Sequence, residues 1–269
     1  MLEKNSLTKK EYWEDIYAGK KRPTSTKGAG CIDHILKKNL VYHQLNHLFK
    51  KHLPQEPKLK FIEYGCGASF WLPYFNIKFG YDVEGIDYSQ LGCDLAEKQL
   101  QRFSATGCVY QKNFIELNEN FNNKYDICAS FGVIEHFENP CGIIAKFFKT
   151  IKENGIMITV VPNLTGIQGF LQRWLGREIY DMHRILSLAK VKQLHEDNGL
   201  DIIYAGHIGI PTLGLNIGQQ RKILTRIYKI YAAILNRVSC FTYKIVPRLP
   251  WELPGASFVV IAMKKQGAL

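Results

Sequence analysis

Two glycines directly after an apolar strand are the sharpest chemical feature of this 269-residue sequence. Tyr64 ends the strand, and Gly65, Cys66 and Gly67 follow it. A strand that runs into Gly-x-Gly lets the backbone turn tightly and approach a ligand, and ligands of open α/β sheets bind at the carboxyl ends of strands. A dinucleotide site would have a third glycine where Phe70 stands, which weakens a dehydrogenase interpretation. A purely structural turn is the alternative.

A carboxylate ends the next apolar strand. Asp87 follows Gly85 and Ile86 and precedes Tyr88 and Ser89. A carboxylate in this place can accept two hydrogen bonds from the cis-diol of a ribose. The alternative is that Asp87 caps the following helix, a role that Ser89 can also fill. Together with the glycine turn, Asp87 favours a ribose-containing ligand.

His136 is the best candidate for a general base. A neutral imidazole is available near pH 7 and can take the proton of a hydroxyl nucleophile. The alternative is that His136 packs over a ligand or caps a helix. The sequence has no Gly-x-Ser-x-Gly elbow, no phosphate-binding P-loop and no His-Glu-x-x-His motif. Its seven cysteines include no Cys-x-x-Cys pair, which predicts reduced thiols in a cytoplasm and no metal site.

Seven apolar segments of strand length must position these residues. They lie at 60–64, 82–87, 108–111, 125–130, 155–161, 200–205 and 257–263. Helical stretches separate most of them, and one helix is expected over about 89–106. Strands that alternate with helices predict βαβ units and therefore an α/β fold with a doubly wound, mostly parallel seven-stranded sheet.

The first part of the chain is expected to form an N-terminal helical arm or lid over residues 1–58, followed by the main domain over 59–269. Apolar residues at helical spacing predict an amphipathic helix over about 31–52, which Pro54 terminates. Residues 19–30 are rich in glycine and lysine and predict a basic loop.

The excess positive charge lies in the two ends of the chain. The formal charge is +11, yet residues 61–201 carry 13 basic and 17 acidic residues. Residues 202–251, by contrast, contain no Asp or Glu at all. A basic insertion before the last strand is therefore predicted over 206–250. Within it, a helix over about 219–246 carries an apolar stripe from Ile223 to Val238.

Four explanations of this insertion remain open. The stripe can pack on the sheet while its basic face stays in water. It can lie on an anionic membrane surface, which a second aromatic segment at 165–175 also favours. It can cover an anionic small substrate, such as a sugar phosphate or a lipid-linked glycan precursor. Nucleic acid is less favoured, because the sequence has no recognised RNA-binding module. No run of 18 uncharged apolar residues occurs, so no transmembrane span is expected.

The motifs together resemble class I S-adenosylmethionine-dependent methyltransferases. In chain order they are Glu63-x-Gly65-x-Gly67-x-Ser69, Asp87, Asn113-Phe114, and residues 131–137, 153–158 and 161–163. The first resembles motif I of that family, the aspartate matches its ribose-binding acidic residue, and the Asn-Phe pair matches its adenine contact. Ser69 replaces the commonest glycine and Asn113 the more usual aspartate, and the remaining motifs follow the family's order and spacing.

The resemblance implies a Rossmann-like methyltransferase fold that binds S-adenosyl-L-methionine and releases S-adenosyl-L-homocysteine. The implied cofactor contacts are Glu63, Tyr64, Gly65, Cys66, Gly67, Asp87, Tyr88, Asn113, Phe114, Phe131, Gly132 and Glu135. The Glu135-His136 pair resembles that of the ubiquinone-biosynthesis O-methyltransferases, with His136 as the base. His183 and Arg184 resemble a substrate-side segment of the same relatives.

The expected function is O-methylation of a small or lipid-linked acceptor. The enzyme is expected in the cytoplasm, and peripheral contact with the inner face of the membrane is a further expectation. Methyl transfer is an in-line displacement, so positioning contributes most of the catalysis. One alternative is an RNA methyltransferase that uses its basic flanks. Another is a protein that binds the cofactor, or a partner, without catalysis.

Overall fold

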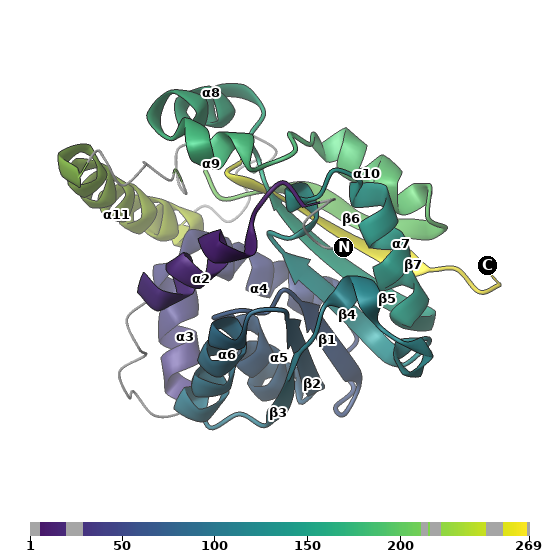
Figure 1. Cartoon of the computed structure of the whole chain (residues 1–269). Coiled ribbons are helices and arrows are strands. Elements are labelled where there is room, and N and C mark those ends of the chain that lie inside the picture. Colours follow the sequence, from purple (N-terminus) through teal and green to yellow (C-terminus); the bar gives the residue numbers. More distant parts are fainter. Residues whose placement is uncertain (1–5, 20–28, 211–214, 216–221, 246–254, 268–269) are drawn as a thin grey trace.

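Seven strands form a single sheet in the computed structural model, which describes residues 6–19, 29–210, 215, 222–245 and 255–267 (Figure 1). The strand order is β3-β2-β1-β4-β5-β7-β6. Neighbouring strands run parallel, except that β7 is antiparallel to both β5 and β6. The predicted doubly wound, mostly parallel sheet is confirmed.

The strands lie where the apolar segments predict them. They are β1 Lys60–Tyr64, β2 Asp82–Asp87, β3 Gly107–Gln111, β4 Tyr125–Phe131, β5 Ile151–Pro162, β6 Leu200–Ile208 and β7 Ser257–Lys264. β5 and β6 are longer than predicted: β5 begins earlier, where Ile151 pairs with Tyr125 of β4, and β6 continues to Ile208, which pairs with Ser257 of β7. Their polar and glycine positions gave no apolar signal in the sequence.

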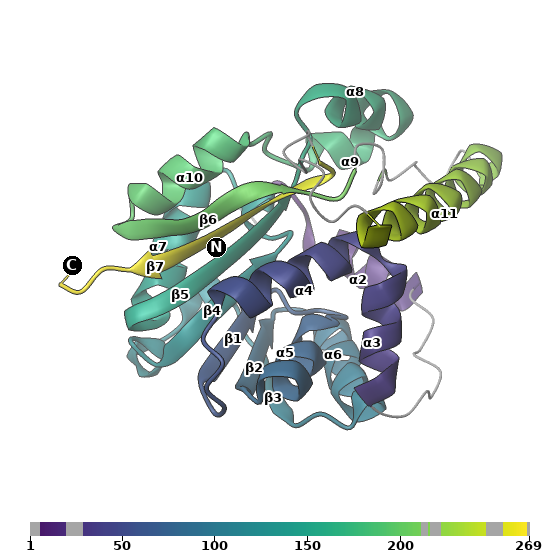
Figure 2. The same ribbon diagram turned by 180° about the vertical axis from the view of Figure 1, so that it is seen from behind.

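Helices cover both faces of the sheet, and the alternation of side chains along each strand builds two cores (Figures 1 and 2). On one face lie α4 (Leu40–His52), α5 (Trp71–Phe79) and α6 (Gln90–Phe103). On the other face lie α7 (Pro140–Thr150) and α10 (Leu188–Glu196). Adjacent residues of β1 therefore enter different cores.

The N-terminal arm contains two helices where the sequence predicts one over 31–52. α3 (Ala29–Lys38) ends before Asn39, and α4 begins directly after it. Asn39 has extended backbone with φ −124°, and its side chain accepts a hydrogen bond from the Tyr42 backbone N–H at 3.1 Å. The single-helix prediction was wrong because an asparagine cap at this position starts a new helix in another direction. The basic loop predicted over 19–30 falls largely outside the described residues.

Four further helices stand at the edge of the sheet where the parallel strands end. α2 (Lys10–Gly19) precedes α3, α8 (Gly166–Leu175) and the short α9 (Arg177–Asp181) follow β5, and α11 (Lys222–Ile245) follows β6. Both views show α8 and α11 at the same end of the molecule as α2 (Figures 1 and 2). Within the described residues, no helix is both long and apolar enough to cross a membrane.

The apolar stripe of α11 does not pack on the sheet. Ile223 is 80% exposed, and the stripe residues Ile227, Ile230, Ile234 and Val238 are each 57–58% exposed. α11 contacts α3 and α4 instead, and the Asn236 side chain bonds the backbone at the start of α4. One explanation that the sequence left open was that the stripe packs on the sheet. The exposure of these residues contradicts it.

Candidate functional site

A cavity of about 490 Å³ opens at the carboxyl edge of the sheet. It lies between the turns that follow β1 and β4, and the N-terminal segment and α4 close its other sides. Its volume is in the range of small-molecule sites. Its lining residues are Ser6, Thr8, Lys10, Trp13, Tyr42, Glu63, Gly65, Cys66, Ala68, Ser69, Phe70, Trp71, Tyr88, Phe114, Phe131, Gly132, Val133, His136 and Phe137.

The turn after β1 needs both of its glycines. Gly65 and Gly67 have φ of +65° and +38°, in the left-handed region that favours glycine. A Cβ on Gly65 would lie 2.8 Å from Val133 Cγ2, and one on Gly67 would overlap the Tyr17 hydroxyl. The turn is therefore packed too closely on both sides to accept a larger residue.

Asp87 ties this turn to the start of α6. Its Oδ2 accepts a hydrogen bond from the Gly67 backbone N–H at 2.9 Å, and its Oδ1 accepts one from the Ser89 N–H at 2.8 Å. Burial raises the pKa of Asp87, and these hydrogen bonds oppose the rise. Ser89 caps α6 as the sequence suggested, because its hydroxyl accepts from the Gly92 N–H at 3.3 Å.

Tyr17 of α2 covers the carboxylate of Asp87. The Tyr17 hydroxyl donates to Asp87 Oδ2 at 3.3 Å, and its ring lies against Gly67 and Gly92. Asp87 consequently does not line the cavity in this arrangement. A ribose diol can reach the carboxylate only after the Tyr17 side chain moves aside.

Glu63 brings a second carboxyl group to the cavity wall. It is 2% exposed, and its Oε2 accepts a hydrogen bond from Ser69 Oγ at 2.7 Å. The Ser69 hydroxyl in turn accepts from the Trp71 backbone N–H at 2.8 Å, which fixes its position. Burial raises the pKa of Glu63 to about 8, although the Ser69 hydrogen bond acts in the opposite direction. A cation bound here would restore the charge of the carboxylate.

Aromatic rings form much of the remaining wall. Tyr42 stacks on Phe70 with ring centroids 5.0 Å apart, and Trp71 stacks on Phe131 at 4.9 Å. Trp13 meets the edge of His136 at 5.1 Å. Aromatic faces beside a buried carboxyl group favour a cationic ligand. The sequence gave no signal for Trp13, Tyr17 or Tyr42, because the arm reaches the site only in the folded chain.

His136 lies on the opposite side of the cavity from the glycine turn. Its Nδ1 is 2.8 Å from Thr8 Oγ1 and 3.1 Å from the Met182 carbonyl oxygen. Because a carbonyl only accepts, Nδ1 carries the proton and Nε2 keeps its lone pair. Burial, with a smaller contribution from His183, lowers the pKa of His136 to about 3. The imidazole is therefore neutral at physiological pH.

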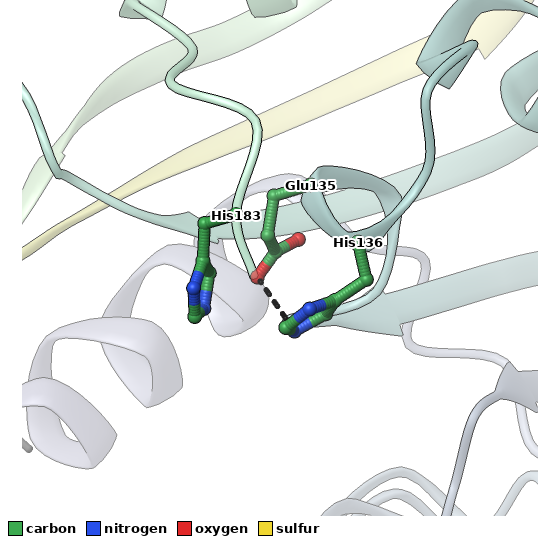
Figure 3. Close-up of side chains that lie close together, drawn as sticks. All are labelled: Glu135, His136 and His183. Atoms are coloured by element: carbon green, nitrogen blue, oxygen red, sulfur yellow. Dashed lines mark ion pairs between the residues drawn. The ribbon is translucent and has the colours of Figure 1, made fainter. Parts of the chain in front are cut away.

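Glu135 and His183 lie beside His136 (Figure 3). The two imidazole rings are 4.4 Å apart, and Glu135 Oε1 is 4.0 Å from His136 Nε2. The Arg184 backbone N–H donates to the Glu135 carbonyl at 2.7 Å, and this contact holds the segment of His183 against the turn after β4. Burial raises the pKa of Glu135 to about 8. The Arg184 guanidinium donates to the Glu138 carbonyl and is exposed.

Three residues of the predicted cofactor set, besides Gly67 and Asp87, do not line the cavity. The Tyr64 ring stacks on Phe147 at 4.1 Å and its hydroxyl bonds Thr150, so the side chain lies in the core under α7. Alternation along β1 sends Glu63 to the cavity and Tyr64 to the other face. Asn113 caps the short helix η1 (Phe114–Glu116) and borders a separate cavity of about 130 Å³. Glu135 also lies behind the cavity wall, while Tyr88, Phe114, Phe131 and Gly132 line it.

A family model for a methyltransferase domain matches residues 34–205. The chain belongs to this family. The match runs from α3 into β6 and includes the glycine turn, Asp87 and the Glu135-His136 pair. It therefore includes most of the cavity wall, and the lining residues of the N-terminal segment precede it.

Curated relatives of this methyltransferase-family chain include ubiquinone biosynthesis O-methyltransferases. The one from Bartonella quintana is 27% identical over 153 residues, which is 54% of this chain and 61% of the relative. The one from Methylococcus capsulatus is 25% identical and covers 56% of this chain and 66% of the relative. The chain thus spans less than two thirds of the length of these relatives.

Solved structures of other methyltransferases and of a cyclase share the fold. A putative sarcosine dimethylglycine methyltransferase from Galdieria sulphuraria has a TM-score of 0.61 at 14% identity, covering 95% of this chain and 97% of the other. A phosphoethanolamine N-methyltransferase from Haemonchus contortus, in complex with S-adenosyl-L-methionine, has a TM-score of 0.56 at 15% identity, covering 83% and 53%. The [4+2]-cyclase SpnF reaches 0.59 at 14% identity, covering 84% and 82%. At these identities the likeness concerns the fold alone.

Proposed function

We propose that the protein transfers a methyl group from S-adenosylmethionine to an oxygen of a small or lipid-linked acceptor. The observation that carries the proposal is the arrangement of the cavity. On one side stand the glycine turn, Glu63 and aromatic faces, which suit a cationic nucleoside; on the other stands His136, a neutral imidazole. S-adenosylmethionine, when bound, supplies a methyl group activated on a sulfonium.

The residues present fit that cofactor. Gly65 brings backbone to the cavity wall without a side chain, and Asp87 offers its carboxylate to a ribose diol once Tyr17 moves away from Gly67. Glu63 faces the cavity with a raised pKa and would pair with the ligand's ammonium group. Phe114 and Tyr88 line the same wall and would contact the base and sugar.

On the acceptor side, His136 is the residue at which a hydroxyl would be activated. Its Nδ1–H is held by Met182 and Thr8, so Nε2 is the atom that would receive a proton. A His136→Gln variant would lose turnover and still bind the cofactor, because the glycine turn and Asp87 are untouched. Loss of cofactor binding in that variant, with the fold intact, would assign His136 to the cofactor instead.

Two helices beside the cavity favour a lipid-linked acceptor. On α8, Ile167, Phe170 and Trp174 are 67–71% exposed, whereas Gln168 and Gln172 are buried against the protein. α8 therefore turns its polar side inward and its apolar side outward, the reverse of an ordinary surface helix.

α11 also presents apolar side chains outward. Its inner side holds Asn236, whose Oδ1 accepts from the Leu40 backbone N–H at 3.1 Å and whose amide donates to the Lys38 carbonyl. Its outer side is the apolar stripe, and Arg226 and Lys229 lie exposed next to it. Apolar residues flanked by basic ones, with no acidic residue over 202–251, suit an anionic bilayer surface.

Vesicle co-sedimentation tests the membrane part of the proposal. The protein is expected to pellet with phosphatidylglycerol vesicles more than with phosphatidylcholine vesicles, and less as salt rises. A double Ile227→Ser and Ile234→Ser variant should remain in solution. Leu91→Ser, which removes an exposed leucine of α6, is the control and should pellet normally. Absence of pelleting with anionic vesicles at low salt would contradict this part.

Transfer of a labelled methyl group tests the reaction itself. Labelled S-adenosylmethionine is incubated with the protein and with a membrane-lipid extract, an aqueous metabolite extract or total RNA. Label in a base-stable ether of the lipid extract is the expected result. Label in RNA, released by ribonuclease, would favour an RNA methyltransferase, and binding without any transfer would favour a non-catalytic protein.

A further inference from the structure

Three side chains from two distant segments direct ligand atoms into one buried space. Glu135 and His136 belong to the short helix η3 (Ile134–His136), and His183 follows α9. Their ligand atoms all lie within 4.8 Å of one another. Figure 3 shows Glu135 between the two imidazole rings. The pair Glu135-His136 and the lone His183 have no metal-ligand spacing in the sequence, which is why the sequence predicts no metal site.

Both histidines are held in the tautomer that a metal requires. The His136 Nδ1–H is directed at the Met182 carbonyl, and the His183 Nδ1–H donates to the Ile179 carbonyl at 2.6 Å. Each ring therefore has its Nε2 lone pair free. A histidine ligand that donates its other N–H to a backbone carbonyl is a common arrangement around bound metals, because that contact fixes the ring.

The carboxyl group of Glu135 is a second, independent indication of a ligand at this place. Its side chain is 1% exposed, and among the described residues its Oε2 has no hydrogen-bond partner. A buried carboxyl oxygen without a hydrogen-bond partner is unfavourable, because it has lost its contact with water and gained nothing in return. A bound cation at this place would satisfy it.

We propose that Glu135, His136 and His183 bind one divalent transition-metal ion. Two imidazoles and one carboxylate are a ligand set that suits Zn²⁺ and neighbouring ions and leaves a position open for a further ligand. Bonds of about 2.0–2.2 Å place tetrahedral ligand atoms roughly 3.3–3.6 Å apart. The 4.0 Å between Glu135 Oε1 and His136 Nε2 is close to that spacing, so small side-chain rotations complete the site.

The ion lies beside the cavity, because His136 is both a ligand and a lining residue. Its role in catalysis rests on the proposed function. With His136 Nε2 bound to the ion, the ion and not the imidazole would activate the acceptor hydroxyl, by lowering its pKa. The O–H proton then leaves to solvent, the oxygen's electron pair forms the bond to the methyl carbon, and the electrons of the carbon–sulfur bond stay on sulfur.

Metal titration of the untagged, chelator-treated full chain tests the site without any need for activity. Zn²⁺ is titrated against a chromophoric chelator, and Co²⁺ is followed by its visible absorption. One equivalent of each is expected to bind. His183→Gln and Glu135→Gln should each weaken metal binding by about 100-fold or more. Mutation of residues that only hydrogen-bond a metal ligand already weakens binding about 10–100-fold, and loss of a ligand itself should cost at least as much. His34→Gln, at an exposed position of α3, is the control and should bind normally.

Thermal unfolding shows whether each variant is folded. The titration of the wild type tests the proposal even if a variant does not fold. Absence of stoichiometric binding by the wild type, or unchanged binding in both folded variants, would overturn the proposal. Methyl transfer is then measured with and without chelator. Full transfer after the metal is removed would overturn the catalytic role and leave the proposed function intact. Metal binding with no transfer on any acceptor would refute the proposed function and leave the metal site intact.

Discussion

Glu63 provides a quantitative test of how the cavity receives a cation. In the empty protein, burial raises its pKa to about 8, so at pH 7 about 90% of the molecules carry a neutral Glu63. An ammonium group bound beside it favours the carboxylate, so binding at pH 7 should release close to one proton from this residue. The affinity for S-adenosylmethionine should fall by about tenfold per pH unit below pH 8 on account of Glu63 alone.

Calorimetry in two buffers of different ionisation enthalpy measures this proton release. At pH 7 the wild type should release about 0.9 proton more than Glu63→Gln, and the ligand's own titration cancels in the difference. Glu116→Gln, at a residue of η1 outside the cavity wall, is the control. Equal proton release from the wild type and Glu63→Gln, with both proteins binding the ligand, would refute the reasoning.

The raised pKa of Glu63 also affects folding. A carboxyl group whose pKa is higher in the folded protein binds a proton more tightly there, so wild-type stability should decline between about pH 4.5 and 8 relative to Glu63→Gln, as chemical denaturation can show. Tyr17→Phe should tighten cofactor binding about fivefold, since it removes one hydrogen bond of about 1 kcal/mol that competes for Asp87; weaker binding would mean that the hydroxyl contacts the ligand. Gly65→Ala should weaken cofactor binding at least tenfold and lower the melting temperature, because its Cβ meets Val133 at a positive φ; wild-type values for both would contradict the close packing of this turn. Asn39→Ala should reduce the free energy of unfolding by about 1 kcal/mol through loss of the α4 cap, and no change would show that the cap is dispensable.

The sheet was predictable because its signals are local. Each strand is a short apolar run bounded by turn residues, and the helices between them leave a parallel arrangement as the simplest solution. The glycine turn and Asp87 were predictable for the same reason, since each stands at the end of its own strand. The break at Asn39 was not, because an asparagine can either continue the helix or cap a new one until packing decides.

The contacts between distant segments were not predictable. Tyr17 reaches Asp87 across 70 positions, and His183 approaches His136 from a loop that the sequence marks only by resemblance. The apolar stripe of α11 was visible, but periodicity does not say whether such a stripe faces the core or the outside. Only the folded chain shows that the stripe is exposed while α11 contacts α3 and α4.

The central claim is that this cavity binds S-adenosylmethionine through the glycine turn and Asp87. Calorimetric titration of the full chain tests it most directly. The wild type should bind one equivalent, and Asp82→Asn, at the exposed start of the same strand, should match it. Asp87→Asn should weaken binding at least about tenfold, because a charged acceptor for the ribose is lost. Failure of the wild type to bind, or equal binding by Asp87→Asn, would contradict the claim.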